Sequence, residues 1–129
     1  MFCIGLVNID LGIVIEPKIV KVGSSVKLTC LWEDNDDSKW LYWYRRTSAT
    51  NITELLWEVF LSHDLSANSS ARPEFTSKFE HYDLVSYRRH HAIVLLEANS
   101  KDEGEYWCEM VILNKNYTSP RATLEVSGA

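Results

Sequence analysis

The chain has 129 residues, 46% of them hydrophobic and 24% charged, which is the size and composition of one soluble domain with a full core. Its formal net charge is −5, and the sequence lacks the concentrated basic charge that nucleic-acid binding requires. No run of about 18 apolar residues occurs, so no segment of the sequence is predicted to span a membrane.

Short alternating apolar runs, separated by turn residues, recur along the chain, and no window holds a long 3.6-residue apolar period. This pattern predicts an all-β sandwich of about nine strands. In chain order, strands are expected at residues 13–16, 26–30, 40–46, 55–61, around 78–79, 92–97, 105–113 and 121–126. Loops are expected at residues 33–37, which are strongly acidic, and at 47–53, 66–73 and 114–120.

The chain shows no internal repeat and no linker, so residues 1–129 are predicted to form a single domain. The core is expected to cover about 13–127, preceded by an N-terminal extension at 1–12. Any attachment to a membrane would depend on segments outside this chain.

The residues from Asp102 to Cys108 read DEGEYWC, and this D-x-G-x-Y-x-C string resembles the F-strand signature of immunoglobulin domains. With Cys30 and Trp43 it completes the Cys…Trp…Cys pattern of that family. The resemblance extends over roughly residues 16–126. It implies a two-sheet antiparallel Greek-key sandwich, a disulfide between Cys30 and Cys108, and a Trp43 ring packed against that disulfide.

The same resemblance implies roles for other residues of the signature. Tyr106 suits the tyrosine corner, in which a buried ring keeps a backbone partner for its hydroxyl. Gly104 suits a tight turn into the strand. Asp102 is expected to accept a salt bridge from the base at the start of strand D, a position that Lys78 fills here.

The spacing between Trp43 and Lys78 leaves room for two further strands, C′ and C″, which favours the variable-type (V-set) domain. Residues 117–124 contain no glycine, whereas antigen-receptor variable domains carry a Phe-Gly-x-Gly bulge in this strand. Adhesion molecules and innate immune receptors are therefore the closer resemblance.

Strand periodicity predicts which side chains face solvent. If Leu41 and Trp43 face the core, alternate residues of the same strand face outward, and the neighbouring strand follows the same rule. The predicted protein-binding face consists of Trp40, Tyr42, Tyr44, Arg46, Trp107 and Glu109. Exposed aromatic clusters of this size usually mark a partner, and members of the family pair through this face. The alternative interpretation is that loops cover these rings.

We therefore expect an extracellular protein-binding module of an immune-type or adhesion receptor, located at the cell surface or secreted. Its partner would be another protein or a second copy of the chain, with Arg46 and Glu109 supplying opposite charges across such a homodimer. Two alternatives stay open, a structural spacer domain and a secreted or pathogen-encoded decoy of such a receptor.

Three N-x-S/T sequons, at Asn51, Asn68 and Asn116, fall in predicted loops and are candidate glycosylation sites. Of the three cysteines, Cys3 is left over in the N-terminal extension. The histidines have no zinc-ligand spacing, and His90 and His91 are expected to be exposed near a turn. No catalytic motif is present, so we expect neither an enzyme nor a bound metal or cofactor.

Overall fold

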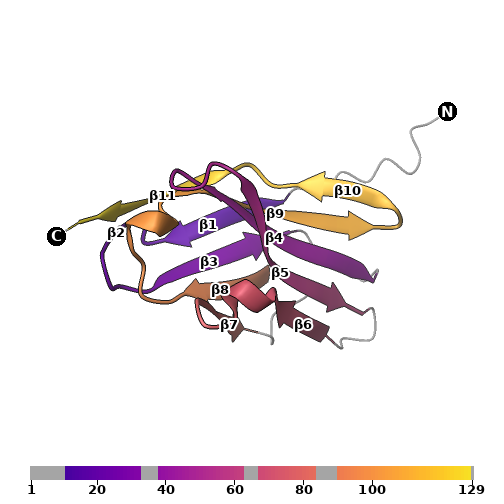
Figure 1. Cartoon of the computed structure of the whole chain (residues 1–129). Coiled ribbons are helices and arrows are strands. Elements are labelled where there is room, and N and C mark those ends of the chain that lie inside the picture. Colours follow the sequence, from indigo (N-terminus) through magenta and orange to yellow (C-terminus); the bar gives the residue numbers. More distant parts are fainter. Residues whose placement is uncertain (1–10, 33–37, 63–66, 84–89, 129) are drawn as a thin grey trace.

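The computed structural model describes residues 11–32, 38–62, 67–83 and 90–128, which form a β-sandwich with two short 3-10 helices (Figure 1). The strands are β1 (Gly12–Glu16), β2 (Ile19–Lys21), β3 (Val26–Leu31), β4 (Lys39–Thr47), β5 (Thr53–Leu61), β6 (Ala67–Ala71), β7 (Phe79–Asp83), β8 (His90–Leu95), β9 (Gly104–Ile112), β10 (Lys115–Thr118) and β11 (Ala122–Ser127). The helices are η1 (Pro73–Phe75) and η2 (Ser100–Asp102). Among the described residues, neither helix has the length and apolarity needed to cross a bilayer.

The strands form two sheets, one four-stranded in the order β1-β3-β8-β7 and one seven-stranded in the order β2-β11-β9-β4-β5-β6, with β10 also paired to β9. Neighbours such as β3 and β8, or β4 and β9, lie far apart in the sequence, as the crossovers of a Greek key require. All of these pairs are antiparallel except that of β2 with β11. The predicted all-β, two-sheet sandwich is confirmed (Figure 1).

The prediction of a loop at residues 66–73 is wrong, because β6 occupies most of this segment. This strand runs antiparallel to β5, from Ala67 opposite Leu61 to Ala71 opposite Trp57. Its sequence, ANSSA, has little intrinsic strand preference. It becomes a strand because the nine-residue β5 beside it offers a pairing edge, a signal that local composition does not carry.

The prediction of a loop at residues 114–120 is also wrong for most of that segment, because β10 covers Lys115–Thr118. There β10 returns along β9, and the two strands are joined by a tight turn at Leu113 and Asn114. Both turn residues have positive φ, 50° and 65°, as the commonest two-residue hairpin turn requires. That turn is usually recognised by a glycine, which this sequence lacks.

The core lies between the sheets, and its centre is the predicted disulfide. Cys30 on β3 is bonded to Cys108 on β9, which links the two sheets covalently, so the prediction is confirmed. Trp43, on the adjacent strand β4, is fully buried and lies opposite Cys108 in the strand register. Leu28 and Leu41 are likewise inaccessible to solvent. The burial alternates along β3 and β4 with the period of two that the sequence predicted.

His90 and His91 are not exposed turn residues, as was expected, because both lie in β8. His90 is partly buried, and the side chain of His91 is fully buried in the core. The indole Nε1–H of Trp43 donates a hydrogen bond of 3.0 Å to Nδ1 of His91. A buried indole N–H requires such an acceptor, and His91 supplies it from the opposite sheet.

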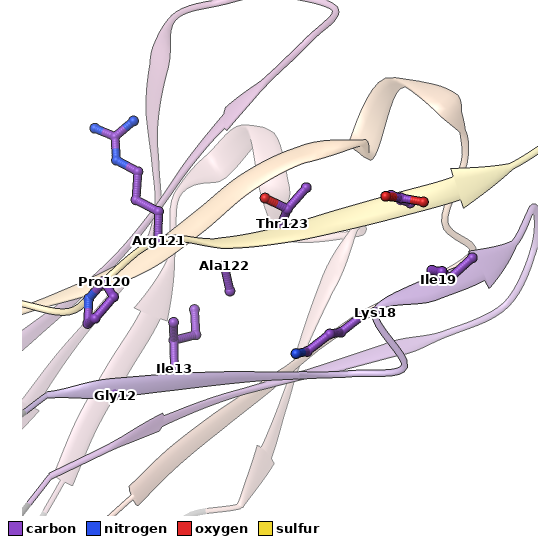
Figure 2. Close-up of a pocket in the computed structure, with 9 residues that line it drawn as sticks. Gly12, Ile13, Lys18, Ile19, Pro120, Arg121, Ala122 and Thr123 are labelled. Carbon is purple, nitrogen blue, oxygen red and sulfur yellow. The ribbon is translucent and has the colours of Figure 1, made fainter.

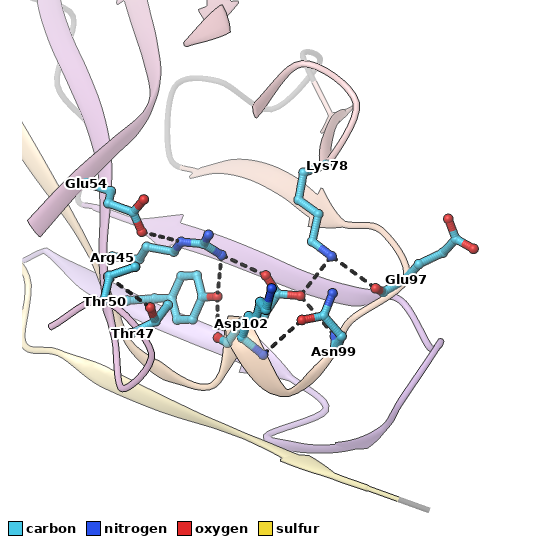
Figure 3. Close-up of polar contacts among 10 residues, drawn as sticks. Arg45, Thr47, Thr50, Glu54, Lys78, Glu97, Asn99 and Asp102 are labelled. Carbon is cyan, nitrogen blue, oxygen red and sulfur yellow. Dashed lines mark hydrogen bonds and ion pairs between the residues drawn. The ribbon is translucent and has the colours of Figure 1, made fainter. Parts of the chain in front are cut away.

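The Asp102 carboxylate organises a buried ion-pair network at one end of the sandwich (Figure 3). The expected pair with Lys78 is present, with 2.8 Å between Nζ and Oδ2. A second base, Arg45, which the sequence analysis did not consider, lies 2.9 Å from Oδ1 and also pairs with Glu54 at 3.1 Å. The Tyr106 hydroxyl donates to the backbone carbonyl of Asp102 at 2.6 Å, which is the geometry of the tyrosine corner.

Gly104 has no space for a side chain. An added Cβ would collide with the carbonyl oxygen of Arg46 and the Cα of Thr47, both backbone atoms of β4. Its φ of +155° is also a conformation that L side chains rarely adopt. The glycine thus allows β9 to begin in close contact with β4, and it sets the register of the two strands that carry the candidate site.

Candidate protein-binding face

The outward surface of the seven-stranded sheet is the strongest candidate for a binding site. Directly opposite residues on neighbouring strands share one face of a sheet, so the strand register arranges the outward side chains in rows. We define the aromatic face by four such rows: Phe60, Trp40, Val111 and Asn116; Glu58, Tyr42, Glu109 and Thr118; Leu55, Tyr44 and Trp107; and Thr53, Arg46, Glu105 and Thr123. The third row stops at Trp107 on β9, because β10 ends before it.

A continuous series of ring contacts runs along the aromatic face. Trp40 packs on Phe60 with ring centroids 4.9 Å apart and lies nearly parallel to Tyr42 at 6.1 Å. Tyr42 is followed by Tyr44 at 6.4 Å, and Tyr44 stacks on Trp107 at 5.8 Å. The structure therefore brings together all four predicted aromatic residues, and it adds Phe60, which the sequence analysis missed.

These rings differ in how much surface they present. Trp40 is 43% exposed, and Tyr42 and Tyr44 are partly buried. Trp107 is only 6% exposed, so the prediction that it presents an open ring on this face is wrong. The guanidinium of Arg121 covers it, with Cζ 3.9 Å from the ring centroid, and Arg121 is held in place by a 3.0 Å salt bridge to Glu105. The exposed aromatic surface of the face is therefore mainly that of Trp40 and Tyr42.

Two carboxylates flank Tyr42, Glu58 on β5 and Glu109 on β9. Burial, with the negative charge of Glu58 and Glu109, raises the pKa of the Tyr42 hydroxyl. Burial and the charge of Glu109 raise the pKa of the Tyr44 hydroxyl in the same way. Both phenols are therefore neutral hydrogen-bond donors at physiological pH, set in a locally negative surface.

Arg46 and the sequon residue Asn51 meet at the opposite end of the face. Arg46 is exposed, and its Nε–H donates to Oδ1 of Asn51 at 3.1 Å. Asn51 lies between β4 and β5, in a connection that agrees with the predicted loop. The other two sequons do not lie in loops as was expected, because Asn68 is in β6 and Asn116 is in β10.

The strand that borders the face is interrupted between β10 and β11, where antigen-receptor domains carry a glycine bulge. Here Ser119 is buried and forms the interruption. Its N–H donates to the carbonyl of Cys108 at 2.9 Å, and its hydroxyl oxygen accepts from the N–H of Cys108 at 3.0 Å. The hydroxyl also donates to the carbonyl of Pro120 at 2.9 Å. The N–H of Cys108 is thus satisfied by a serine side chain rather than by a backbone carbonyl, and the interruption forms without a glycine.

A hollow of about 610 Å³ lies between β1, β2 and β11, and Thr123 of the fourth row is part of its lining (Figure 2). Its lining includes Ile13, Lys18, Ile19 and Ala122, and the side chain of Arg121 extends away from it (Figure 2). The hollow is open, and the charged residues in its lining are Lys18, Arg121 and Glu125. Within the described residues, no three His, Cys, Asp or Glu side chains are placed to hold a metal ion. The acidic segment 33–37, His63 and Cys3 lie outside the described residues.

The fold and this face together define an immunoglobulin-type domain of the variable kind. The family model for the immunoglobulin V-set domain matches residues 16–127, and the chain belongs to this family. V-set domains as a class are protein-binding modules, and they are typically not enzymes.

Among solved structures, the chain is similar to one from a study of T cell specificity and activation by the bacterial superantigen toxic shock syndrome toxin-1. That similarity has a TM-score of 0.75 and 21% identity, and it covers 93% of this chain and all of the other. No curated protein matches the sequence. At this identity the structural match supports the fold alone.

Proposed function

We propose that this domain is an extracellular protein-recognition module and that the aromatic face is its contact surface. The observation that carries the proposal is the exposed Trp40, packed on Phe60 and followed directly by Tyr42 on β4, an inner strand of the seven-stranded sheet. Tryptophan and tyrosine are the side chains that most often dominate the binding energy of protein interfaces. Solvent exposure of such rings is otherwise unfavourable for a soluble domain.

The distribution of charge on the face supports a second copy of the chain as the partner. The acidic second row and Arg46 in the fourth row lie on either side of the apolar third row, which holds Leu55 and Tyr44. The other charged residue of the fourth row, Glu105, is paired with Arg121. A twofold axis through the third row would place Glu58 and Glu109 of one copy opposite Arg46 of the other. This is the self-complementarity that a symmetric dimer needs.

The disulfide supports an oxidising, extracellular setting, because such bonds persist mainly in secreted and cell-surface proteins. The sequons at Asn51, Asn68 and Asn116 agree with that setting. Attachment to a cell surface would distinguish a receptor from a secreted or pathogen-encoded decoy, and it depends on segments outside this chain. A spacer domain, the remaining alternative, predicts that the aromatic face has no partner.

The test compares Trp40→Ala and Tyr42→Ala with Ile19→Ala, which removes a 64% exposed apolar side chain on β2, outside the aromatic face. Sedimentation equilibrium at rising concentration measures self-association of the folded domains. We expect wild type and Ile19→Ala to dimerise, and both aromatic variants to stay monomeric. A charge-reversed Arg46→Glu variant should also fail to dimerise, and adding Glu109→Lys to it should restore the dimer.

Binding of the multimerised domain to a panel of cells provides the second measurement. If the chain is monomeric at all concentrations but stains cells, and Trp40→Ala and Tyr42→Ala remove the staining while Ile19→Ala keeps it, the partner is a different protein. A monomer that stains no cells would favour the spacer interpretation and contradict the proposal.

A further inference from the structure

The sequon at Asn116 lies on the aromatic face itself. Asn116 is opposite Val111 on β9, and Val111 is opposite Trp40 on β4, so the three residues stand in the first row of the face. Tyr117 between the sequon residues packs against the core, which leaves the side chains on either side of it directed outward. The hydroxyl of Thr118, the third residue of the sequon, donates to Glu109 at 3.5 Å and agrees with this orientation.

Asn116 is solvent-exposed, as a glycan acceptor must be. It is two strands away from Trp40, and neighbouring strands are about 4.8 Å apart, so the two residues are roughly 10 Å apart across the sheet. The first sugars of an N-linked glycan are bulky and hydrophilic, and they extend outward from the sheet over neighbouring side chains. A glycan attached here would therefore stand beside Trp40.

We propose that N-glycosylation of Asn116 controls access to the Trp40 end of the aromatic face. In the modified chain, a protein partner cannot seat on Trp40 and Tyr42, and in the unmodified chain these rings are open. The regulatory meaning of this shield rests on the proposed function. The shield itself is a property of the surface and can be measured without a natural partner.

The modification transfers an oligosaccharide from a lipid-linked pyrophosphate donor. The amide nitrogen of Asn116 forms a bond to C1 of the first sugar, and the bond from C1 to the pyrophosphate oxygen breaks. The amide loses one proton, and the lipid pyrophosphate leaves with the bonding electrons. No oxidant or reductant is needed.

Asn51 provides a contrast within the same chain. Its sequon lies beside Arg46, in the fourth row, three rows from Trp40. The contact with Arg46 uses Oδ1 of Asn51, whereas a glycan is attached through the amide nitrogen, so the two are compatible. A glycan at Asn51 is therefore expected to leave the Trp40 end open, and a variant that removes this sequon is the matched control.

The test uses a nanobody raised against unglycosylated chain and selected because Trp40→Ala abolishes its binding. Every protein carries Ser70→Ala, which removes the sequon at Asn68, the residue of β6 opposite Phe60 in the first row, and the chain with this change alone serves as wild type. This wild type and its variants Asn116→Gln, Thr118→Val, Thr118→Ser and Thr53→Val are all secreted from the same glycosylating eukaryotic cells. Thr118→Ser keeps the sequon at Asn116, and Thr53→Val removes only the sequon at Asn51. Mass spectrometry of glycopeptides measures the occupancy of Asn116 in each preparation.

We expect Asn116 to carry a glycan in wild type. The wild-type protein should then bind the nanobody at least about tenfold more weakly than Asn116→Gln and Thr118→Val do. Thr118→Ser and Thr53→Val should be as weak as wild type, and enzymatic removal of the glycan from wild type should restore tight binding. An unmodified Asn116 in secreted wild type, or equal affinities of glycosylated wild type and Asn116→Gln, would overturn the proposal. Because the nanobody replaces the partner, either result leaves the dimerisation test of the proposed function independent.

Discussion

The indole N–H of Trp43 and Nδ1 of His91 form a hydrogen bond of 3.0 Å that joins the two sheets in the fully buried core. Trp43 belongs to β4 of the seven-stranded sheet, and His91 belongs to β8 of the four-stranded sheet. This contact and the disulfide between Cys30 and Cys108 are two separate connections across the sandwich. The disulfide constrains the unfolded chain, whereas the hydrogen bond satisfies a polar atom that burial would otherwise leave unpaired.

Replacement of His91 by leucine should destabilise the domain, although leucine fills a similar apolar space. The indole N–H of Trp43 then stays buried without its acceptor, which costs about 1–3 kcal/mol. Chemical denaturation of folded variants measures this loss. The double variant Trp43→Phe, His91→Leu removes both partners, and it should be less destabilised than the sum of the single variants. Strict additivity would show that the hydrogen bond contributes nothing.

Arg45 should contribute more to stability than Lys78, although only Lys78 was predicted from the sequence. The side chain of Arg45 is 10% exposed, pairs with both Asp102 and Glu54, and packs on Phe75 with Cζ 5.0 Å from the ring centroid. The side chain of Lys78 is 25% exposed. Removal of one partner from a buried ion pair typically costs about 3–5 kcal/mol.

We therefore expect Arg45→Met to lower the free energy of unfolding by about that amount and Lys78→Met by clearly less, as measured by urea denaturation. Met is chosen for both because it keeps most of the aliphatic volume. Equal losses in the two variants, or a larger loss for Lys78→Met, would contradict this ranking.

Sequence patterns predicted the centre of the fold because its signals are local in the chain. Cys30, Trp43 and Cys108 are marked by residue type and by the alternation of the strands around them. A signal for Arg45 was also present. Arg45 continues the inward series of Leu41 and Trp43, and a charged residue at such a position requires a buried partner.

The candidate face was predictable in its rows but not in its exposure. Alternation along β4 placed Trp40, Tyr42 and Tyr44 outward, but it could not reveal what covers Trp107. The cover is Arg121, which lies in the short connection between the end of β10 at Thr118 and the start of β11 at Ala122. Similarly, Asn116 joined the face through the pairing of β10, which depends on a turn without glycine.

Because of the Tyr106 hydroxyl, we predict that the free energy of unfolding falls at high pH. Burial raises the pKa of Tyr106 to about 12, partly opposed by the positive charge of Arg45. An unfolded tyrosine has a pKa of about 10, so the folded state favours the neutral phenol. This contribution is complete below about pH 10 and is lost as the pH rises from about 10 through 12, because only the unfolded chain ionises readily there.

Urea denaturation at pH 7, 10 and 11 measures this effect, and Tyr106→Phe is the reference because it cannot ionise. We expect wild type to lose stability more steeply than Tyr106→Phe between pH 10 and 11. Parallel slopes for the two proteins would mean that Tyr106 ionises normally in the folded state. Tyr42 and Tyr44 are present in both proteins, so their ionisation affects both slopes alike.

Removal of the Arg121 side chain should open the aromatic face further. Arg121→Ala takes away the guanidinium that lies 3.9 Å from the Trp107 ring centroid, and it also releases Glu105 from its salt bridge. That salt bridge is close to half exposed on both sides and contributes little to stability, so the fold should be nearly unaffected. Acrylamide quenching of tryptophan fluorescence should increase, because Trp107 becomes accessible to the quencher.

The matched control is Glu105→Gln, which breaks the same salt bridge but leaves the guanidinium in place over the ring. Its quenching should stay near that of wild type. If Arg121→Ala and Glu105→Gln increase quenching equally, the salt bridge rather than the stacked guanidinium keeps solvent from Trp107. If neither increases it, Tyr44, whose ring stacks on Trp107 at 5.8 Å, is sufficient to cover the indole.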